Sequence, residues 1–222
     1  LAWFHPVHWY SIDRANFRNH RKSIIVDGRI AFMGGAGLAD QWLGNASNEK
    51  EWRDIQIRVE GAAAQAQQTG FAQNWLRTTG ELISGKAYFP TLEDCEGGIE
   101  VQTILSAPSD GASKAGTMYF VALQSAQKYI YIANPYFVPT PAVLYALDSV
   151  CKRGVQVRLM VACDKNDTWW ARYNSLRFYG QLFCSGVEIF EYQPSMLHQK
   201  TMVVDGVWAT VGTTNLDNRS FS

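Results

Sequence analysis

The pattern of hydrophobic and polar residues divides the chain into alternating strands and helices. Residues 52–60 alternate polar and apolar side chains, which is typical of a half-buried strand, and residues 61–79 have the spacing of a helix. After Gly98, similar runs predict strands at Ile99–Leu105, Tyr129–Ala133, Val155–Ala162 and Val187–Tyr192, and helices at about Ser113–Gln127, Pro141–Arg153 and Thr168–Cys184. Strands that alternate with helices of this length predict a sheet covered by helices.

Two segments of the chain repeat each other at a fixed offset of 178 residues. The shared residues are His20, Lys22, Val26, Asp27, Gly28, Ala31, Gly34 and Leu38 in the first copy, and His198, Lys200, Val204, Asp205, Gly206, Ala209, Gly212 and Leu216 in the second. In each copy, Asp-Gly separates two apolar runs, which predicts a β-hairpin with a tight turn. Because residues two apart on a strand face the same side, the His and Lys of each copy are expected to project together.

The repeat predicts two related halves. A loop at residues 80–98, rich in glycine and acidic residues, separates them. We expect residues 1–80 to form the C-terminal part of a first half, residues 81–98 a linker, and residues 99–222 a second half that is truncated at its end. The expected fold class is α/β, with a mixed sheet flanked by helices in each half and an active site at their interface. The unequal lengths around the two motifs lead us to expect an interior fragment of a longer protein.

Composition fits a globular protein and argues against several other classes. The chain has 222 residues, 47% of them hydrophobic, and 20 Lys and Arg residues balance 20 Asp and Glu residues. These values exclude intrinsic disorder and collagen, and the zero net charge argues against a protein that mainly grips nucleic acid. The four cysteines are far apart, which favours buried thiols in a reducing compartment over a zinc site or a disulfide framework. No apolar run approaches the 18 or so residues that span a bilayer.

The two His-x-Lys pairs are suited to phosphoryl chemistry. One neutral imidazole can attack phosphorus while a second, protonated imidazole donates a proton to the leaving oxygen. Two lysines can neutralise charge on the non-bridging oxygens. None of these roles requires a metal ion, so we expect neither a metal nor another cofactor.

These motifs resemble the signature of the phospholipase D superfamily, H-x-K-x4-D-x6-G-[SG]-x-N in two copies. The second copy, from His198 to Asn215, matches throughout, with Thr213 in place of the usual serine. The first copy, from His20 to Gly37, matches up to its last position, where Gly37 replaces the asparagine. That replacement removes a phosphate contact, for which a glycine backbone N–H is a partial substitute.

The sequence around the motifs is similar to bacterial cardiolipin synthases. The similar blocks are RNHRK (residues 18–22), WRD (52–54), NPYFVP (134–139) and NLDNRSF (215–221). This resemblance implies the transfer of a phosphatidyl group between two phosphatidylglycerol molecules, which gives cardiolipin and glycerol. It implies that His20 is the nucleophile and His198 the general acid and base, although the near symmetry of the repeat also allows the reverse.

The resemblance also implies roles for the neighbouring residues. The expected phosphate-binding residues are Lys22, Lys200, Asn215, Thr213 and Gly35. Asp27 and Asp205 complete the catalytic motifs, but their position in turns favours a structural role. Asp54, 34 positions after His20, is expected to orient an imidazole, as the third member of a hydrolase triad does.

The motifs leave the acceptor and the location open. A phospholipase or phosphodiesterase would use water with the same intermediate, while a nuclease and a non-catalytic lipid-binding protein are further alternatives. The expected partners are an anionic phospholipid, phosphatidylglycerol, and the surface of the bacterial cytoplasmic membrane; no nucleic acid is expected. The Trp169-Trp170 pair suits a membrane interface or interdomain packing, and the basic residues 18–21 suit an anionic head group or a solvated strand entry.

Overall fold

The structure, a computed structural model, describes residues 1–4, 19–92, 97–106, 114–165 and 167–217. The chain divides into two units. The first unit combines Leu1–Met33 with Ile57–Pro108, and the second combines Gly34–Gln56 with Ser109–Ser222. The end of the first motif, from Gly34 onward, and the segment that follows it therefore group with the second motif. The boundaries that we predict at residues 80 and 98 stay predictions.

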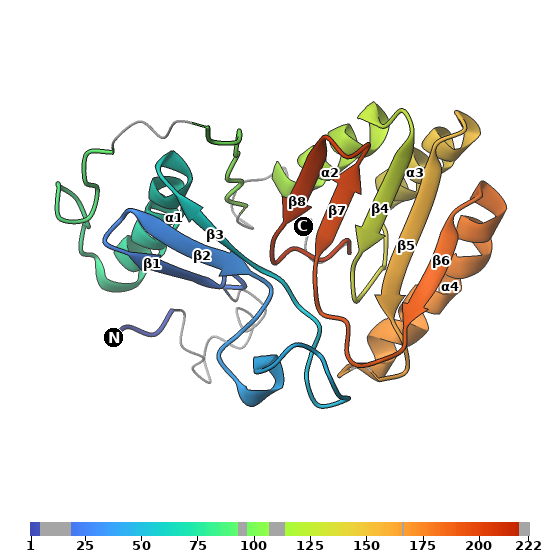
Figure 1. The fold of residues 1–222 in the computed structure, drawn as a ribbon, viewed down its shortest axis with the longest axis horizontal. Helices are drawn as coiled ribbons and strands as arrows, with labels where there is room; N and C mark the ends of the chain where they lie inside the picture. Colours follow the sequence, from blue (N-terminus) through green and yellow to red (C-terminus); the bar gives the residue numbers. More distant parts are fainter. Residues whose placement is uncertain (5–18, 93–96, 107–113, 166, 218–222) are drawn as a thin grey trace. The chain divides into compact units, whose positions relative to one another are not determined.

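A three-stranded sheet and one helix form the first unit. The sheet has the order β1-β2-β3, with β1 at Ser23–Val26, β2 at Ile30–Gly34 and β3 at Gln56–Glu60. Helix α1 (Ala62–Thr79) packs against this sheet and ends at Gly80, which has the left-handed conformation that glycine adopts freely (Figure 1).

A five-stranded mixed sheet forms the framework of the second unit. Its order is β6-β5-β4-β7-β8; β4, β5 and β6 run parallel, and β7 and β8 form an antiparallel hairpin beside β4 (Figure 1). The strands are β4 (Tyr129–Ala133), β5 (Gln156–Ala162), β6 (Glu188–Tyr192), β7 (Thr201–Val204) and β8 (Trp208–Val211). The helices are α2 (Lys114–Ser125), α3 (Pro141–Lys152) and α4 (Trp169–Ser185), and a short 3-10 helix, η2, spans Asp40–Trp42.

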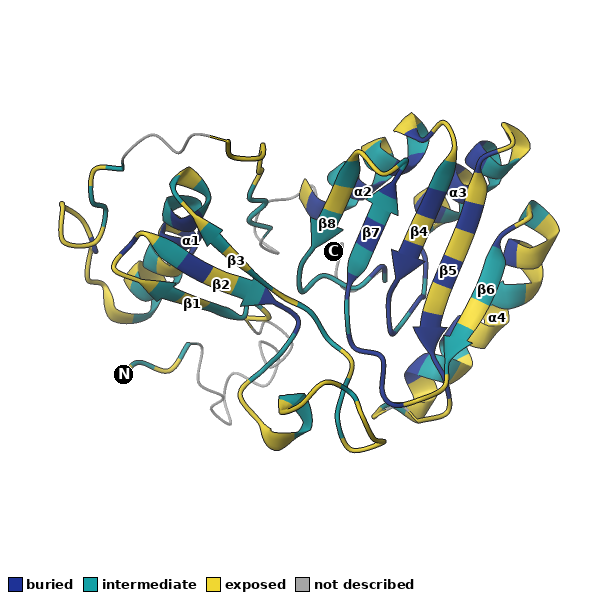
Figure 2. Cartoon of the chain, in the orientation of Figure 1, coloured by how far each residue is buried: buried dark blue, intermediate teal, exposed yellow. Residues whose placement is uncertain are grey.

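The helices of the second unit cover one face of its sheet. Along β5, the side chains of Val157, Leu159 and Val161 are buried, while the side chains between them are exposed, and Figure 2 shows this alternation. Together with residues of α2, α3 and α4, they form one continuous hydrophobic core. Burial of each such side chain stabilises the fold by about 1.5–3 kcal/mol. This core holds β4 and β7 side by side at the place where the second motif begins.

The α/β fold class is confirmed, and both predicted hairpins form. Each turn has an aspartate and a glycine with positive φ: 54° and 64° at Asp27 and Gly28, and 54° and 73° at Asp205 and Gly206. The His-x-Lys pairs, however, lie just before their strands rather than within them. The strand predicted at residues 52–60 begins only at residue 56.

The predicted strand Ile99–Leu105 is wrong. These residues are not in a strand, and Ile99 and Val101 have exposed side chains. Within the described residues, no strand pairs with this segment, so its alternating pattern has no ladder to join. Its end instead packs on α1, where Leu105 lies against Gly70.

Some sequence predictions lie outside the described residues. They concern Arg18 of the basic run, Cys95, the predicted start of the helix at Ser113, and residues 218–221 of the last similarity block. Cys163 is buried and Cys151 is partly buried, but Cys184 is exposed, so the prediction of a buried thiol is wrong for Cys184.

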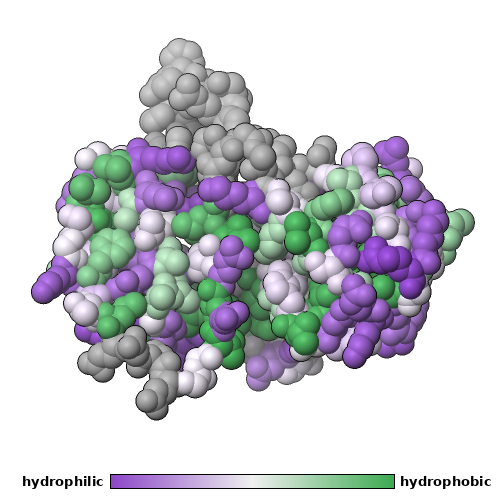
Figure 3. Space-filling model, turned by 90° about the horizontal axis from the view of Figure 1, so that it is seen from above, coloured by the Kyte–Doolittle hydropathy of each residue, from purple (hydrophilic) through white to green (hydrophobic). Residues whose placement is uncertain are grey.

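The described helices and the visible surface were compared with what a membrane protein requires. Among the described helices, none is both long and apolar enough to cross a bilayer. The visible face in Figure 3 intersperses hydrophobic and hydrophilic residues. Trp169 and Trp170, at the start of α4, are exposed by 78% and 53%, and their role at a membrane interface stays a prediction.

Candidate functional site

The second motif lies at the carboxyl end of the parallel strands. The antiparallel register places Thr201, the first residue of β7, opposite Ala133, the last residue of β4, so His198 and Lys200 precede β7 at this edge. Ligands of α/β sheets commonly bind outside the carboxyl ends of strands. Lys200 is fully buried, and its ammonium group donates a hydrogen bond to the carbonyl of His198. The backbone carbonyl of His198 therefore holds the Lys200 side chain in place.

Asp54 forms a short hydrogen bond with His198. Its Oδ2 lies 2.6 Å from His198 Nδ1, and the two side chains are 3% and 10% exposed. An ionised carboxylate only accepts hydrogen bonds, so Nδ1 carries the proton and Nε2 is left for chemistry. The backbone N–H of Ile55 donates to Asp54 Oδ1 at 2.8 Å.

The Asp54 carboxylate is held in its ionised form. Burial by itself would raise the pKa of this carboxyl group, but the hydrogen bonds from His198 and Ile55 and the positive charges of His198 and Lys200 lower it by more. Its pKa therefore lies below the ordinary value. A fixed negative charge beside Nδ1 stabilises a His198 imidazolium.

Two tryptophans enclose this pair. The ring centroids of Trp42 and Trp52 lie 5.6 and 5.3 Å from that of His198 and 5.0 Å from each other. Trp42 Nε1 also donates a hydrogen bond to Asp54 Oδ2 at 3.2 Å. The imidazole is therefore bordered by aromatic surface as well as by the carboxylate.

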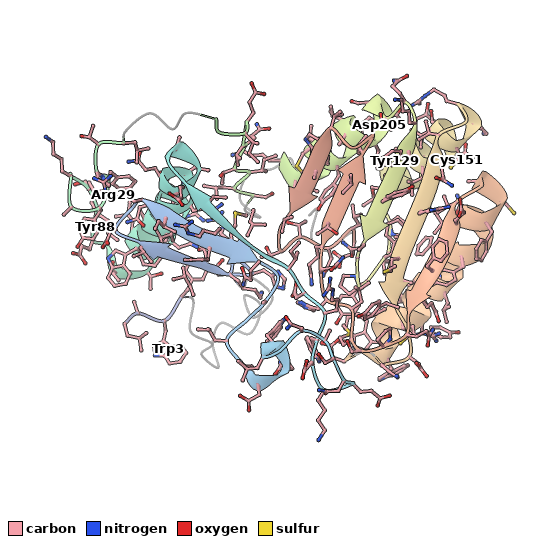
Figure 4. The ribbon with its side chains drawn as sticks, viewed as in Figure 1. Trp3, Arg29, Tyr88, Tyr129, Cys151 and Asp205 are labelled. Atoms are coloured by element: carbon pink, nitrogen blue, oxygen red, sulfur yellow. The ribbon has the colours of Figure 1, made fainter. Side chains whose placement is uncertain are left out.

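The motif aspartate of the second copy has a structural role. Asp205 accepts hydrogen bonds from the backbone N–H groups of Gln127, Lys128 and Tyr129, each at 2.8 Å. Figure 4 shows Asp205 and Tyr129 at the same end of the sheet. These bonds lower the pKa of the Asp205 carboxyl group and attach the hairpin turn to the start of β4. Asp27 lies in the matching turn of the first unit, where it is exposed.

The remaining predicted residues of the second copy follow β8. Thr213 and Asn215 are partly buried. Among the described residues, no hydrogen-bond partner reaches the buried amide oxygen of Asn215. The turn before them is hydrogen-bonded to the backbone of the motif lysine, because Gly212 N donates to the carbonyl of Lys200 at 3.2 Å. Phosphate binding by Thr213 and Asn215 stays a prediction.

The first motif has the same local geometry within its own unit. Lys22 Nζ donates to the carbonyl of His20 at 3.1 Å, as Lys200 does to His198, and His20 is exposed. The guanidinium group of Arg21 donates to the carbonyls of Gly70 and Ser106, each at 3.2 Å. Arg21 therefore ties the motif to α1 and to the segment after it.

Gly35 lies against Asp54. A Cβ atom at Gly35 would lie 2.4 Å from Asp54 Oδ1, too close for any real contact. Gly35 therefore packs directly against the Asp54 carboxylate, and its predicted phosphate contact stays a prediction.

Sequence reasoning missed Trp42. Trp52 belongs to the WRD block, and its position two residues before Asp54 was a usable signal.

Comparison with known proteins finds sequences that are similar to this chain. Residues 119–222 match the family described as "Cardiolipin synthase, PLD-like domain". The chain is 36% identical over 208 residues to the probable cardiolipin synthase YwiE of Bacillus subtilis, covering 94% of this chain and 41% of that protein. It is 38% identical over 220 residues to a cardiolipin synthase of Geobacillus thermodenitrificans, covering 98% of this chain and 44% of that protein.

Through residues 119–222, the chain is similar to members of the phospholipase D superfamily. A solved structure supports the same fold: the phosphatidylserine synthase of Haemophilus influenzae superposes with a TM-score of 0.61 at 15% identity, covering 90% of this chain and 54% of that one. The chain spans less than half the length of the two cardiolipin synthases.

Both copies of the motif keep the histidine, the lysine and the aspartate, while the first copy has Gly37 at the position of the asparagine. Within the described residues, no group of three or more His, Cys, Asp or Glu side chains is arranged to hold a metal ion. The donor and acceptor groups near His198 include the Asp54 carboxylate, the Lys200 ammonium group and the indole N–H of Trp42. They can orient an imidazole and neutralise an anion.

Proposed function

We propose that the protein is a phosphatidyltransferase that condenses two phosphatidylglycerol molecules into cardiolipin and glycerol. The observation that carries this proposal is the buried Asp54–His198 pair beside Lys200, in a chain that resembles cardiolipin synthases over most of its length. The pair supplies an imidazole with a defined tautomer, and Lys200 supplies a positive charge that water does not screen well.

In the first step of the proposed reaction, the nucleophile is His20. A ring nitrogen attacks the phosphorus of one phosphatidylglycerol, a P–N bond forms, and the P–O bond to the head-group glycerol breaks. His198, protonated on Nε2, gives that proton to the departing glycerol oxygen. General acid catalysis of this kind contributes about 100- to 10,000-fold.

The second step reverses the roles of the groups. His198, now neutral at Nε2, takes the proton from a head-group hydroxyl of a second phosphatidylglycerol. The hydroxyl oxygen attacks phosphorus, the P–N bond breaks, and cardiolipin leaves. Throughout both steps, Asp54 keeps the proton on Nδ1, so that only Nε2 exchanges protons.

Lysines and small polar side chains are proposed to hold the phosphate. The ammonium groups of Lys22 and Lys200 neutralise the non-bridging oxygens, whose charge grows as the transition state forms. Thr213 and Asn215 are proposed to complete this binding. The buried position of Lys200 supports its role, because a buried lysine is rare unless it is paired or functional.

The substrates place the proposed reaction at a lipid surface. Phosphatidylglycerol is an anionic lipid of bilayers, so we propose that the protein works at the surface of the bacterial cytoplasmic membrane. The exposed Trp169 and Trp170 suit such an interface.

The proposal is tested with the full-length natural protein and vesicles of phosphatidylglycerol. Lipid products are identified by mass spectrometry for the wild type, His20→Ala and His198→Ala, with a chelator present. We expect cardiolipin and glycerol from the wild type and neither product from the two variants. Phosphatidic acid without cardiolipin would instead assign a hydrolase, and the absence of any lipid product would overturn the proposed function.

A further inference from the structure

The two copies of the motif differ at one position that contacts Asp54. The second copy has Gly212-Thr213 where the first has Gly34-Gly35. A Cβ atom at Gly212 would meet nothing within 4 Å, whereas Cβ atoms at Gly34 and Gly35 would lie 2.1 Å from Ile55 O and 2.4 Å from Asp54 Oδ1. The glycine pair of the first copy therefore makes room for the residues around Asp54.

Gly35 is needed for space rather than for its backbone conformation. It is not among the glycines with positive φ, so its backbone is accessible to other residues. The nearest obstacle to a side chain is the Asp54 carboxylate, whose three carboxyl atoms are all within 2.8 Å of the Cβ position. An added methyl group would displace Oδ1 from the backbone N–H of Ile55.

Trp42 donates a hydrogen bond to the same carboxylate. Its Nε1 donates to Oδ2, the oxygen that also binds His198 Nδ1. Trp42 ends the short helix η2, and Trp52 N donates to Gln41 O at 2.6 Å, which closes the loop between the two tryptophans. The Asp54 carboxylate is therefore packed against Gly35 and accepts hydrogen bonds from the backbone N–H of Ile55 and the indole N–H of Trp42.

We propose that Trp42 and Gly35 are positioning residues for His198, acting through Asp54. The indole N–H and the bare Cα of Gly35 fix the carboxylate in the one rotation that presents Oδ2 to Nδ1. The rotation of the carboxylate in turn fixes the imidazole plane and directs Nε2 toward its substrate. The catalytic part of this inference rests on the proposed function, but the orientation of His198 does not.

Two variants remove one support each. Trp42→Phe keeps an aromatic ring but removes the N–H group, and Gly35→Ala adds the obstructing methyl group. The matched controls are Trp75→Phe, which removes an indole N–H bonded to the Glu81 carboxylate in the first unit, and Gly180→Ala, where a Cβ atom meets nothing within 4 Å. We expect Trp42→Phe and Gly35→Ala to lower kcat about 10-fold or more with little change in KM, and the controls to match the wild type.

A double-mutant cycle separates positioning from general support of the fold. If Trp42 acts through Asp54, Trp42→Phe costs about 10-fold in the wild type and close to nothing in an Asp54→Asn background. Equal losses in both backgrounds, or no loss in Trp42→Phe, would overturn the proposal.

A second readout does not depend on lipid turnover. Diethyl pyrocarbonate acylates imidazole nitrogen, and mass spectrometry of the His198 peptide gives the rate of modification in the full-length protein. We expect His198 to be modified several-fold faster in Trp42→Phe and Gly35→Ala, at the wild-type rate in both controls, and no faster in Trp42→Phe with Asp54→Asn than in Asp54→Asn alone. His198 rates in Trp42→Phe and Gly35→Ala that equal the wild-type rate would refute the positioning role even if the protein proves to have another activity.

Discussion

Asp54→Asn should change the tautomer of His198. In the wild type, Asp54 accepts three hydrogen bonds, from Ile55 N and Trp42 Nε1 and from His198 Nδ1. An asparagine has one acceptor oxygen and one NH2 group. If its oxygen accepts from Ile55, its NH2 group faces two donors, and His198 must move its proton from Nδ1 to Nε2 to form a bond. The nitrogen that must take a proton in the second step would then already carry one.

The change of tautomer sets the expected fall in kcat. Wrong-tautomer substitutions in triads that work by the same logic lower kcat by up to about 10,000-fold, and general base catalysis alone is worth about 100-fold or more. We expect kcat to fall by about 100- to 10,000-fold, which corresponds to about 3–5 kcal/mol in activation free energy. KM should change little, because Asp54 does not touch the substrate in the proposed reaction.

Initial rates of cardiolipin formation measure this effect. The matched control is Asp40→Asn, the same substitution at an exposed position of η2 in the same segment. Circular dichroism and thermal unfolding of both variants verify that they are folded. If folded Asp54→Asn retained a kcat within threefold of the wild type, the assignment of Asp54 as the group that orients His198 would be refuted.

The remaining predictions concern stability. The pKa of Asp54 is lower in the folded protein than its ordinary value of about 3.9, so the ionised carboxylate stabilises the fold fully above that value. This stabilisation is lost as the pH falls through the folded pKa. The free energy of unfolding of the wild type should therefore fall more steeply with acid than that of Asp54→Asn. Asp205→Ala should lower the melting temperature, measured by calorimetry, because three backbone N–H groups at the start of β4 lose their acceptor. Gly28→Ala should unfold the first unit at lower denaturant concentration, since its Cβ would lie 2.3 Å from Tyr88 O at a φ of +64°. Leu159→Ala should lower the unfolding free energy in urea by about 2–5 kcal/mol, because Leu159 is fully buried.

Local patterns predict those parts of the fold that local forces decide. The Asp-Gly turns, the apolar strand β5 and the helix that begins at Ala62 all follow from turn chemistry and periodicity. The segment at residues 99–105 has the same periodicity as a strand, yet it is irregular, because a strand also needs a neighbour and sequence alternation does not supply one.

The site was predictable only in part. The motif residues His198 and Lys200 are visible through the repeat, and the spacing of Asp54 marks it as an orienting carboxylate. Asp54 can meet His198 only because the segment Gly34–Gln56 packs with the second unit. That packing joins residues far apart in the sequence, and no local pattern predicts it. Trp42 was missed for the same reason, since its role depends on the hydrogen bond that its indole N–H donates to Asp54.

The most direct test of the account is to trap the covalent intermediate. The full-length protein is mixed briefly with phosphatidylglycerol labelled in its phosphate, quenched under alkaline conditions that preserve phosphohistidine, and digested for mass spectrometry. We predict label on His20 in the wild type and no label in His20→Ala. Label on His198 would reverse the two roles, and turnover of lipid without labelling of either histidine would contradict the proposed phosphohistidine mechanism.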